Sequence, residues 1–254
     1  DGSRPMTRPV MYRGRLYGTT FAGGTLGDTG TVFRLIPRNG GETWDYELLY
    51  TFNDTPDAWG PIALNVNSNG VLFGFTMGGG TANRGALFTV SPTASRSWQE
   101  RVLQSFRGNT DGVEVMSGVG QPIFETGGAL VNTAPWGGRN RYGTAFRFNP
   151  ADGAAAEPEI FHHFDSASGH PGHGVVAGEG GVLYGSAWYG GANRAGTVFS
   201  LTPPVAPATE WTIATLYEFP RGTPPGMAAT PWPSTSCVTS APVRCSAQQA
   251  TARP

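Results

Sequence analysis

The segment Leu16–Thr20, LYGTT, decides the fold because the chain repeats it three more times. The later copies read LFGFT, LVNT and LYGS, at Leu72–Thr76, Leu130–Thr133 and Leu183–Ser186. Each copy runs into a run of glycines and then into a second motif, GTVF, GALF, GTAF or GTVF, which ends at Phe33, Phe88, Phe146 and Phe199. Successive phenylalanines of this set lie 55, 58 and 53 residues apart. A period of this size is typical of a repeat architecture.

Each repeat contains four short stretches with the pattern of β-strands. In the second repeat these predicted strands cover residues 61–66, 71–76, 85–90 and 98–106. The pair Asn69-Gly70 between the first two predicts a tight hairpin turn. The last stretch places Trp98, Val102 and Phe106 on one face, with the period of two that strands have. We expect the phenylalanine that ends the second motif to be buried at equivalent places in all four repeats.

Four antiparallel strands in each repeat of about 55 residues are typical of a β-propeller blade. A β-solenoid is the alternative, although its repeats are usually shorter. We therefore predict an all-β, β-propeller-like array of four blades over residues 1–230, each blade with four antiparallel strands. The sequence leaves open whether the four blades close on themselves or are a fragment of a larger propeller.

Residues 231–254 break the repeat pattern. They are rich in Pro, Ser, Thr, Ala and Arg and show almost no apolar periodicity, so they cannot bury enough surface to offset their ordering entropy. We expect a disordered tail there, although Gly222–Ala228 reads like the opening of a fifth repeat. The only two cysteines, Cys237 and Cys245, lie in this tail, and the sequence does not decide whether they pair.

Composition excludes several functional classes. Lys and Arg number 17 against 18 for Asp and Glu, and charged residues make up only 14% of the chain. A nucleic-acid partner is not expected without a basic patch, and no apolar run approaches the roughly 18 residues of a membrane span. The chain opens at Asp1 without a signal-peptide pattern, so we expect a processed chain or a start further upstream. Its oligomeric state is left open.

The sequence motifs of the repeats resemble those of the GloVer tandem repeats. The shared pattern is LYGTT, a GG loop, GTVF-x-L and a last strand ending in Phe, followed by Asp-Gly and Pro, and the resemblance covers roughly residues 1–230. Repeat 1 matches best, whereas repeat 3 has lost the aromatic residue and the glycine in LVNT. The resemblance implies a repeat fold in a bacterial protein that is exported and sometimes anchored at the cell surface. It implies no catalytic residue.

The glycine loops gather the candidate ligand-binding residues. In a propeller, the loop between the second and third strands lies on the same face as the connection to the next blade. Aromatic rings that stack on a sugar, with arginines to fix its orientation, suit a glycan ligand. The candidate residues are Trp136, Trp188, Tyr189, Arg141 and Arg194. The alternative is that these aromatic residues plug the mouth of the ring and the arginines only solvate its edge.

All four histidines fall within twelve residues, together with Asp165. Imidazoles and a carboxylate suit zinc or another transition-metal ion. His162 and His163 are neighbours on a predicted strand and point to opposite faces, so at most one of them can join a site. The candidate metal ligands are His170, His173 and His162. No pattern of a metalloprotease or a cysteine-rich zinc site supports this hypothesis.

No catalytic motif is present. Asp54, Asp57 and Asp111 fall on the predicted loop face, but nothing pairs two of them as glycoside cleavage requires. The glycine loops lack the ending of a phosphate-binding loop, so we expect no cofactor. The leading hypothesis is a non-catalytic exported module that binds glycans or protein surfaces. A polysaccharide hydrolase or lyase, and a structural spacer of a surface protein, are the alternatives.

Overall fold

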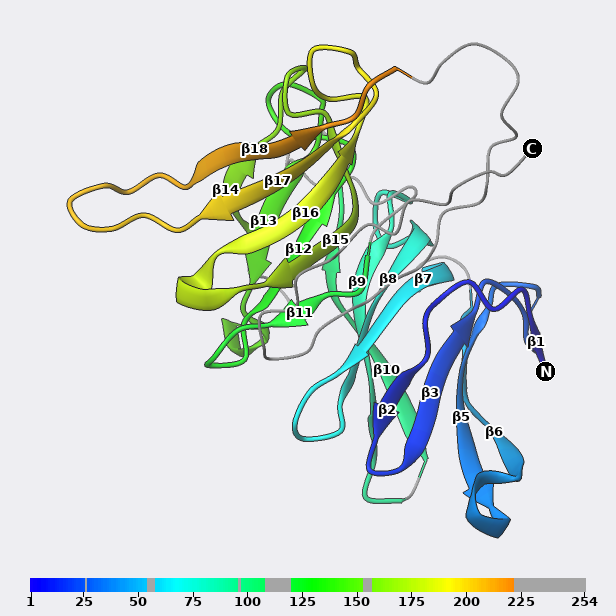
Figure 1. The fold of residues 1–254 in the computed structure, drawn as a ribbon. Helices are drawn as coiled ribbons and strands as arrows, with labels where there is room; N and C mark the ends of the chain where they lie inside the picture. Colours follow the sequence, from blue (N-terminus) through cyan, green and yellow to red (C-terminus); the bar gives the residue numbers. More distant parts are fainter. Residues whose placement is uncertain (26, 54–57, 96, 108–119, 153–156, 222–254) are drawn as a thin grey trace, which may run out of the picture. The chain divides into compact units, whose positions relative to one another are not determined.

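The computed structural model describes residues 1–25, 27–53, 58–95, 97–107, 120–152 and 157–221 (Figure 1). Residues 1–221 form one compact unit. Within the described ranges the regular structure is β-strand apart from three single-turn 3-10 helices, η1 (Asn39–Gly41), η2 (Pro150–Asp152) and η3 (Glu179–Gly181). The predicted all-β class is therefore confirmed. The predictions on the tail 231–254, on Cys237 and Cys245, and on Asp54, Asp57 and Asp111 lie outside the described residues.

Each repeat forms one four-stranded antiparallel sheet with its strands in chain order. Blade 1 consists of β2 (Val10–Tyr12), β3 (Arg15–Thr20), β5 (Thr31–Arg38) and β6 (Thr43–Thr51). Blade 2 consists of β7 (Ala58–Val66), β8 (Leu72–Gly79), β9 (Ala86–Pro92) and β10 (Trp98–Ser105). The bounds of blade 2 lie within a few residues of the four strands that the sequence predicts.

The third and fourth repeats follow the same plan. Blade 3 consists of β11 (Ile123–Phe124), β12 (Leu130–Ala134), β13 (Thr144–Phe148) and β14 (Glu159–His163). Blade 4 consists of β15 (His170–Ala177), β16 (Leu183–Trp188), β17 (Thr197–Thr202) and β18 (Thr212–Glu218). A separate two-stranded sheet pairs β1 (Gly2–Ser3) with β4 (Ala22–Gly23). The described chain is thus a propeller-like array of four blades.

The register explains why LYGTT contains a glycine. Gly18, at the centre of β3, pairs with Phe33 on β5, and a methyl group on Gly18 would come within 2.6 Å of Cζ in that ring. Gly74 and Gly185 pair with the corresponding phenylalanines of blades 2 and 4. The bare backbone therefore leaves room for the phenylalanine ring across the sheet.

Blade 3 departs from this rule at the position of the glycine. Asn132 replaces the glycine and is buried opposite Phe146. Strand β11 has only two residues, and the Asn132 amide reaches past its end to donate a 2.9 Å hydrogen bond to the carbonyl oxygen of Gly120. The side chain thus takes over a hydrogen bond that a longer first strand would have supplied from its backbone.

The hydrophobic core lies between neighbouring sheets. Each of three clusters combines residues from two consecutive blades. At each boundary the phenylalanine after the last strand of one blade packs against the second-motif phenylalanine of the next. The ring centroids are 4.9 Å apart in Phe52–Phe88, 6.3 Å in Phe106–Phe146 and 5.1 Å in Phe164–Phe199.

One core prediction needs correction. Phe88, Phe146 and Phe199 are buried as predicted, but Phe33 is only half-buried. Its ring stacks on Tyr46 within the same sheet, 5.6 Å between centroids. The reason is positional, since no described blade precedes blade 1 and covers that side of its sheet.

Candidate functional site

Four aromatic rings meet at the boundary between blades 3 and 4. Trp136 follows β12, and its ring centroid lies 4.4 Å from the imidazole of His170, the first residue of β15. Tyr142 lies 4.9 Å from the same imidazole, and Tyr189, which follows β16, lies 6.2 Å from it. His170 is buried, whereas Trp136 and Tyr189 are 37% and 64% exposed. Two exposed rings from neighbouring blades therefore flank one buried imidazole. We call these four residues the aromatic cluster.

The segment before His170 fixes the position of its imidazole. The Asp165 carboxylate accepts hydrogen bonds from the backbone N–H of Ala167, at 3.0 Å, and of Ser168, at 2.8 Å. These bonds, the one from Ser168 foremost, hold the pKa of Asp165 below its ordinary value. At the end of this turn, Nδ1 of His170 lies 2.8 Å from the carbonyl oxygen of Pro135. Because a carbonyl only accepts, Nδ1 carries the proton of this bond.

The boundary between blades 1 and 2 is built differently at the same place. Pro61 lies against Gly30 and Pro171 lies against Gly143, which are the first residues of the second motif in the preceding blade. The residues before these prolines, Gly60 and His170, therefore occupy equivalent positions. The Phe21 ring packs over Gly60, where a methyl group would meet it at 2.8 Å. Phe21 directly follows β3 as Pro135 directly follows β12, so Trp136 corresponds to Ala22. The later boundary thus has an imidazole where the first boundary has no side chain, and a tryptophan where the first has Ala22.

The two candidate arginines occupy one conformational position in their loops. Arg141 and Arg194 have φ angles of 62° and 51° and close turns by donating from their backbone N–H to Gly138 and Gly191. Asn83 holds this position in blade 2, where its side chain accepts a hydrogen bond from Gly79. Within the described ranges, no hydrogen bond or ion pair involves either guanidinium group. The two arginines thus lie on the loops of the aromatic cluster without ring contact to it.

Trp188 does not join the aromatic cluster. Its indole lies over Gly172, where a methyl group would come within 2.8 Å of Nε1. Its ring also meets His173 edge-to-face, 5.6 Å between centroids, and the side chain is half-buried. Neighbouring residues at the end of a strand point to opposite faces, which separates Trp188 from Tyr189.

The structure does not bring the histidines together as a metal site. Among the described residues, no group of three His, Cys, Asp or Glu side chains could hold an ion. His170 is held within the aromatic cluster, His173 lies against Trp188, and His162 packs edge-to-face on Phe164 at 4.9 Å. Blade 4 begins between these residues, so closeness in sequence does not become closeness of the imidazoles.

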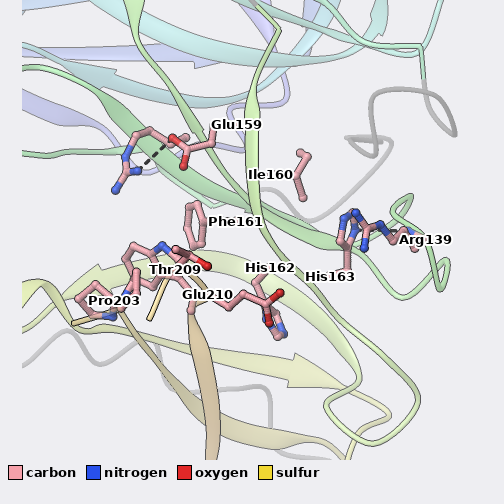
Figure 2. A pocket seen from close by; sticks show the side chains of 12 residues that line it. Arg139, Glu159, Ile160, Phe161, His162, His163, Pro203, Thr209 and Glu210 are labelled. Carbon is pink, nitrogen blue, oxygen red and sulfur yellow. Dashed lines mark hydrogen bonds and ion pairs between the residues drawn. The ribbon is translucent and has the colours of Figure 1, made fainter. Parts of the chain in front are cut away.

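A groove of about 610 Å³ runs between β14 and the loop that joins β17 to β18 (Figure 2). Figure 2 shows Phe161 above Thr209 and Pro203, with Arg139 and His163 at the other end. The Arg147 guanidinium lies 5.7 Å from the centroid of Phe161 and 5.9 Å from that of Trp211. Both rings stay accessible from the groove.

Two charged groups of this groove, Arg147 and Glu159, are already paired. Arg147 Nε lies 2.8 Å from Glu125, and Nη1 lies 3.1 Å from Glu159. The hydrogen bond to Glu125 is the main cause that raises the pKa of Arg147 above its ordinary value. Arg34, Glu47 and Trp98 repeat the arrangement between blades 1 and 2. We interpret the guanidinium–indole contact as a structural link between blades.

Two histidines of β14 border this groove. Burial lowers the pKa of His162, and its buried Nε2 has no hydrogen-bond partner among the described residues. Burial also lowers the pKa of His163, whose Nδ1 accepts a 3.3 Å hydrogen bond from the backbone of Arg139. Both imidazoles are therefore favoured in the neutral form.

Sequence reasoning missed two members of the aromatic cluster. Tyr142 directly precedes the GTAF motif, at a position that holds Thr29 in blade 1 and Ala195 in blade 4. An aromatic residue at this position in one repeat alone was the available signal. His170 was predicted as a metal ligand, because Trp136 and Tyr142 come from the preceding repeat and Tyr189 lies nineteen residues further along the chain, so none is visible in its local sequence.

Comparison with solved structures gives distant likenesses. The α-L-arabinanase of Cellvibrio cellulosa is 13% identical, with a TM-score of 0.43, over 81% of this chain and 76% of that one. Its complex with arabinohexaose is 12% identical, with a TM-score of 0.40, over 80% and 75%. PorZ, described as a surface component of the type-IX secretion system of Porphyromonas gingivalis, is 14% identical, with a TM-score of 0.41, over 81% of this chain and 34% of PorZ.

These distant likenesses carry no information on activity or ligand. A search of curated proteins found no match. Among the described residues, no helix is long and apolar enough to cross a membrane.

The family comparison covers nearly the whole chain. The model of the Gloeobacter/Verrucomicrobia repeat matches residues 4–235, which includes all four blades. This agrees with the LYGTT and GTVF motifs and with their repetition as one sheet each. The chain therefore belongs to the Gloeobacter/Verrucomicrobia repeat family.

Proposed function

We propose that the protein is a non-catalytic, exported module that binds glycans through the aromatic cluster. The observation that carries the proposal is the pair of exposed rings, Trp136 and Tyr189, whose centroids lie 4.4 Å and 6.2 Å from that of the buried His170 imidazole. Sugars present an apolar face that stacks on aromatic rings, and a rigid platform saves the entropy of ordering side chains on binding. The family resemblance and the four-blade array are compatible with a surface module.

The polar groups that a sugar needs lie on the same two loops. Arg141 follows Trp136 by five residues and Arg194 follows Tyr189 by five residues, each at the same turn position. Their guanidinium groups are exposed and project from a backbone that is fixed by the turn. We propose that they donate hydrogen bonds to the hydroxyl groups of a sugar stacked on the rings.

The experiment is a polysaccharide array, followed by titration of an oligosaccharide from the strongest hit. Trp136→Ala and Tyr189→Ala should each weaken binding at least about tenfold, equivalent to ~1.4 kcal/mol. Trp59→Ala is the matched control, because this indole lies at the boundary of blades 1 and 2 and donates to Asn83 at 3.2 Å. The control should bind like the wild type. Circular dichroism must show that all three variants fold.

Two results would contradict the proposal. Shortened or unsaturated products from any polysaccharide would make the protein a hydrolase or a lyase. Unchanged binding in both cluster variants, or no binding to any glycan, would reduce the aromatic cluster to packing and favour a structural spacer.

A further inference from the structure

The two ends of the blade array carry apolar sheet faces that are covered everywhere else in the chain. We call the side of a sheet that contacts the next blade its forward face, and the side that contacts the preceding blade its backward face. Each of the three internal boundaries joins one forward face to one backward face. Four blades therefore leave the backward face of blade 1 and the forward face of blade 4 uncovered in the described chain.

The backward face of blade 1 is exposed where its counterparts are buried. Leu16, Phe33 and Leu35 are only half-buried. Their counterparts in the other blades are at most 2% exposed; these are Leu72, Phe88, Val90, Leu130, Phe146, Phe148, Leu183, Phe199 and Leu201. Tyr46 on β6 belongs to the same face and is 42% exposed. Blade 1 thus has apolar residues of the core type on a face that no described residue of the chain covers.

The forward face of blade 4 shows the same contrast. Leu216 is 54% exposed, whereas Leu49 and Leu103, three residues before the last phenylalanine of blades 1 and 2, are buried. Tyr184 is exposed, whereas its counterparts Tyr17 and Phe73 are buried. Exposed apolar sheet surface of this kind marks an interaction site in a water-soluble protein.

We propose that a second copy of this chain covers these faces, with the forward face of blade 4 packed on the backward face of blade 1 in the next copy. At each of the three internal boundaries a forward face packs against a backward face. The same pairing of surfaces can therefore form between two copies. In this arrangement Phe219 of one copy meets Phe33 of the next, as Phe52 meets Phe88 within the chain. The contact is heterologous, so it builds closed rings or open filaments of copies.

The test uses one charge on each face. Leu216→Arg blocks the forward face and Tyr46→Arg blocks the backward face, and both side chains are exposed, so both variants should fold. Wild-type protein should show a mass that rises with concentration in analytical ultracentrifugation. Each variant alone should be monomeric, because its remaining open face finds only a blocked one. An equimolar mixture should form a dimer and nothing larger. Val205→Arg, at an exposed site in the β17–β18 loop, should assemble like the wild type.

Each other outcome overturns the proposal. If the wild-type protein stays monomeric and both variants melt at a lower temperature than the wild type, blade 4 packs on blade 1 of the same chain. A variant that still dimerises alone would show like-with-like contact of one face. Assembly only after removal of residues 222–254 would show that this segment covers an end face. A wild type that is monomeric with unchanged stability in both variants would show that the end faces have no occupant.

Discussion

At the scale of single residues, the two comparable blade boundaries differ at several aligned positions, among them Gly60 and His170. Gly60 leaves room for the Phe21 ring to fold down, whereas His170 at the same position carries an imidazole that touches Trp136 and Tyr189. A proline directly follows each position, but the aromatic residues around it differ, since Phe21 corresponds to Pro135 and Ala22 to Trp136. The exposed aromatic cluster at the later boundary thus depends on Trp136 and Tyr189 as well as on His170.

Phe88 gives a direct test of the core. It is completely buried and packs against Phe52 across the boundary of blades 1 and 2. Phe88→Ala should lower the free energy of unfolding by about 3–5 kcal/mol, because the ring leaves a cavity between two sheets. Phe33→Ala is the matched control and should cost clearly less, since Phe33 is half-buried. Equal losses in urea denaturation would contradict the difference in burial.

His162 should make stability depend on pH. Burial lowers its pKa in the folded protein, whereas the unfolded chain has a value of about 6.5. The unfolded state therefore binds more protons once the pH falls below about 6.5, and stability should decrease as the solution is acidified through that range. His162→Gln, with the residue that blade 2 carries as Gln104, should reduce this loss. Melting curves at about pH 7.5 and about pH 5.5 measure it, and an identical decrease in the variant would exclude His162 as the cause.

At the scale of elements, the second strand of each blade is shaped by the phenylalanine opposite it. Gly18, Gly74 and Gly185 leave space for the ring, whereas Asn132 in blade 3 is buried and donates to the carbonyl oxygen of Gly120. This pairing of a glycine with a phenylalanine ring occurs in blades 1, 2 and 4. The glycine of the LYGTT motif is therefore explained by packing across the sheet and needs no catalytic or binding role.

Gly74→Ala tests this requirement. The added methyl group would overlap the Phe88 ring and lie 2.5 Å from the carbonyl oxygen of Ala63. Because both neighbours are buried, the sheet must shift, and the melting temperature should fall markedly. Gly18→Ala is the control, since its added methyl group meets only the half-buried Phe33 ring, which can move. A loss for Gly74→Ala no larger than that for Gly18→Ala would show that the strands adjust freely.

At the scale of the whole molecule, stability should come from the boundaries between blades. The three core clusters each need two sheets, so a single blade buries too little to fold by itself. Guanidinium–indole contacts reinforce two boundaries, at Arg34–Trp98 and Arg147–Trp211. The chain is therefore expected to unfold by losing neighbouring blades together.

The C-terminal segment, by contrast, should contribute little to stability. Residues 231–254 have few apolar side chains to bury, so truncation after residue 230 should leave the melting temperature unchanged. Truncation after residue 211 is the control, because it removes β18, which pairs along β17, and it should lower the melting temperature. A clear loss on the shorter truncation would show that the segment packs on the blades.

The sequence by itself determined the repeat, the number of blades and the strands within each. Motifs such as LYGTT and GTVF are local, and period-two patterning needs no knowledge of distant contacts. Only the tertiary structure decided which aromatic residues meet. Trp136, Tyr142, His170 and Tyr189 come from two repeats, and Trp188 turns away because adjacent residues face opposite sides. The exposure of Phe33 likewise depends on what lies beside the blade, which no local pattern records.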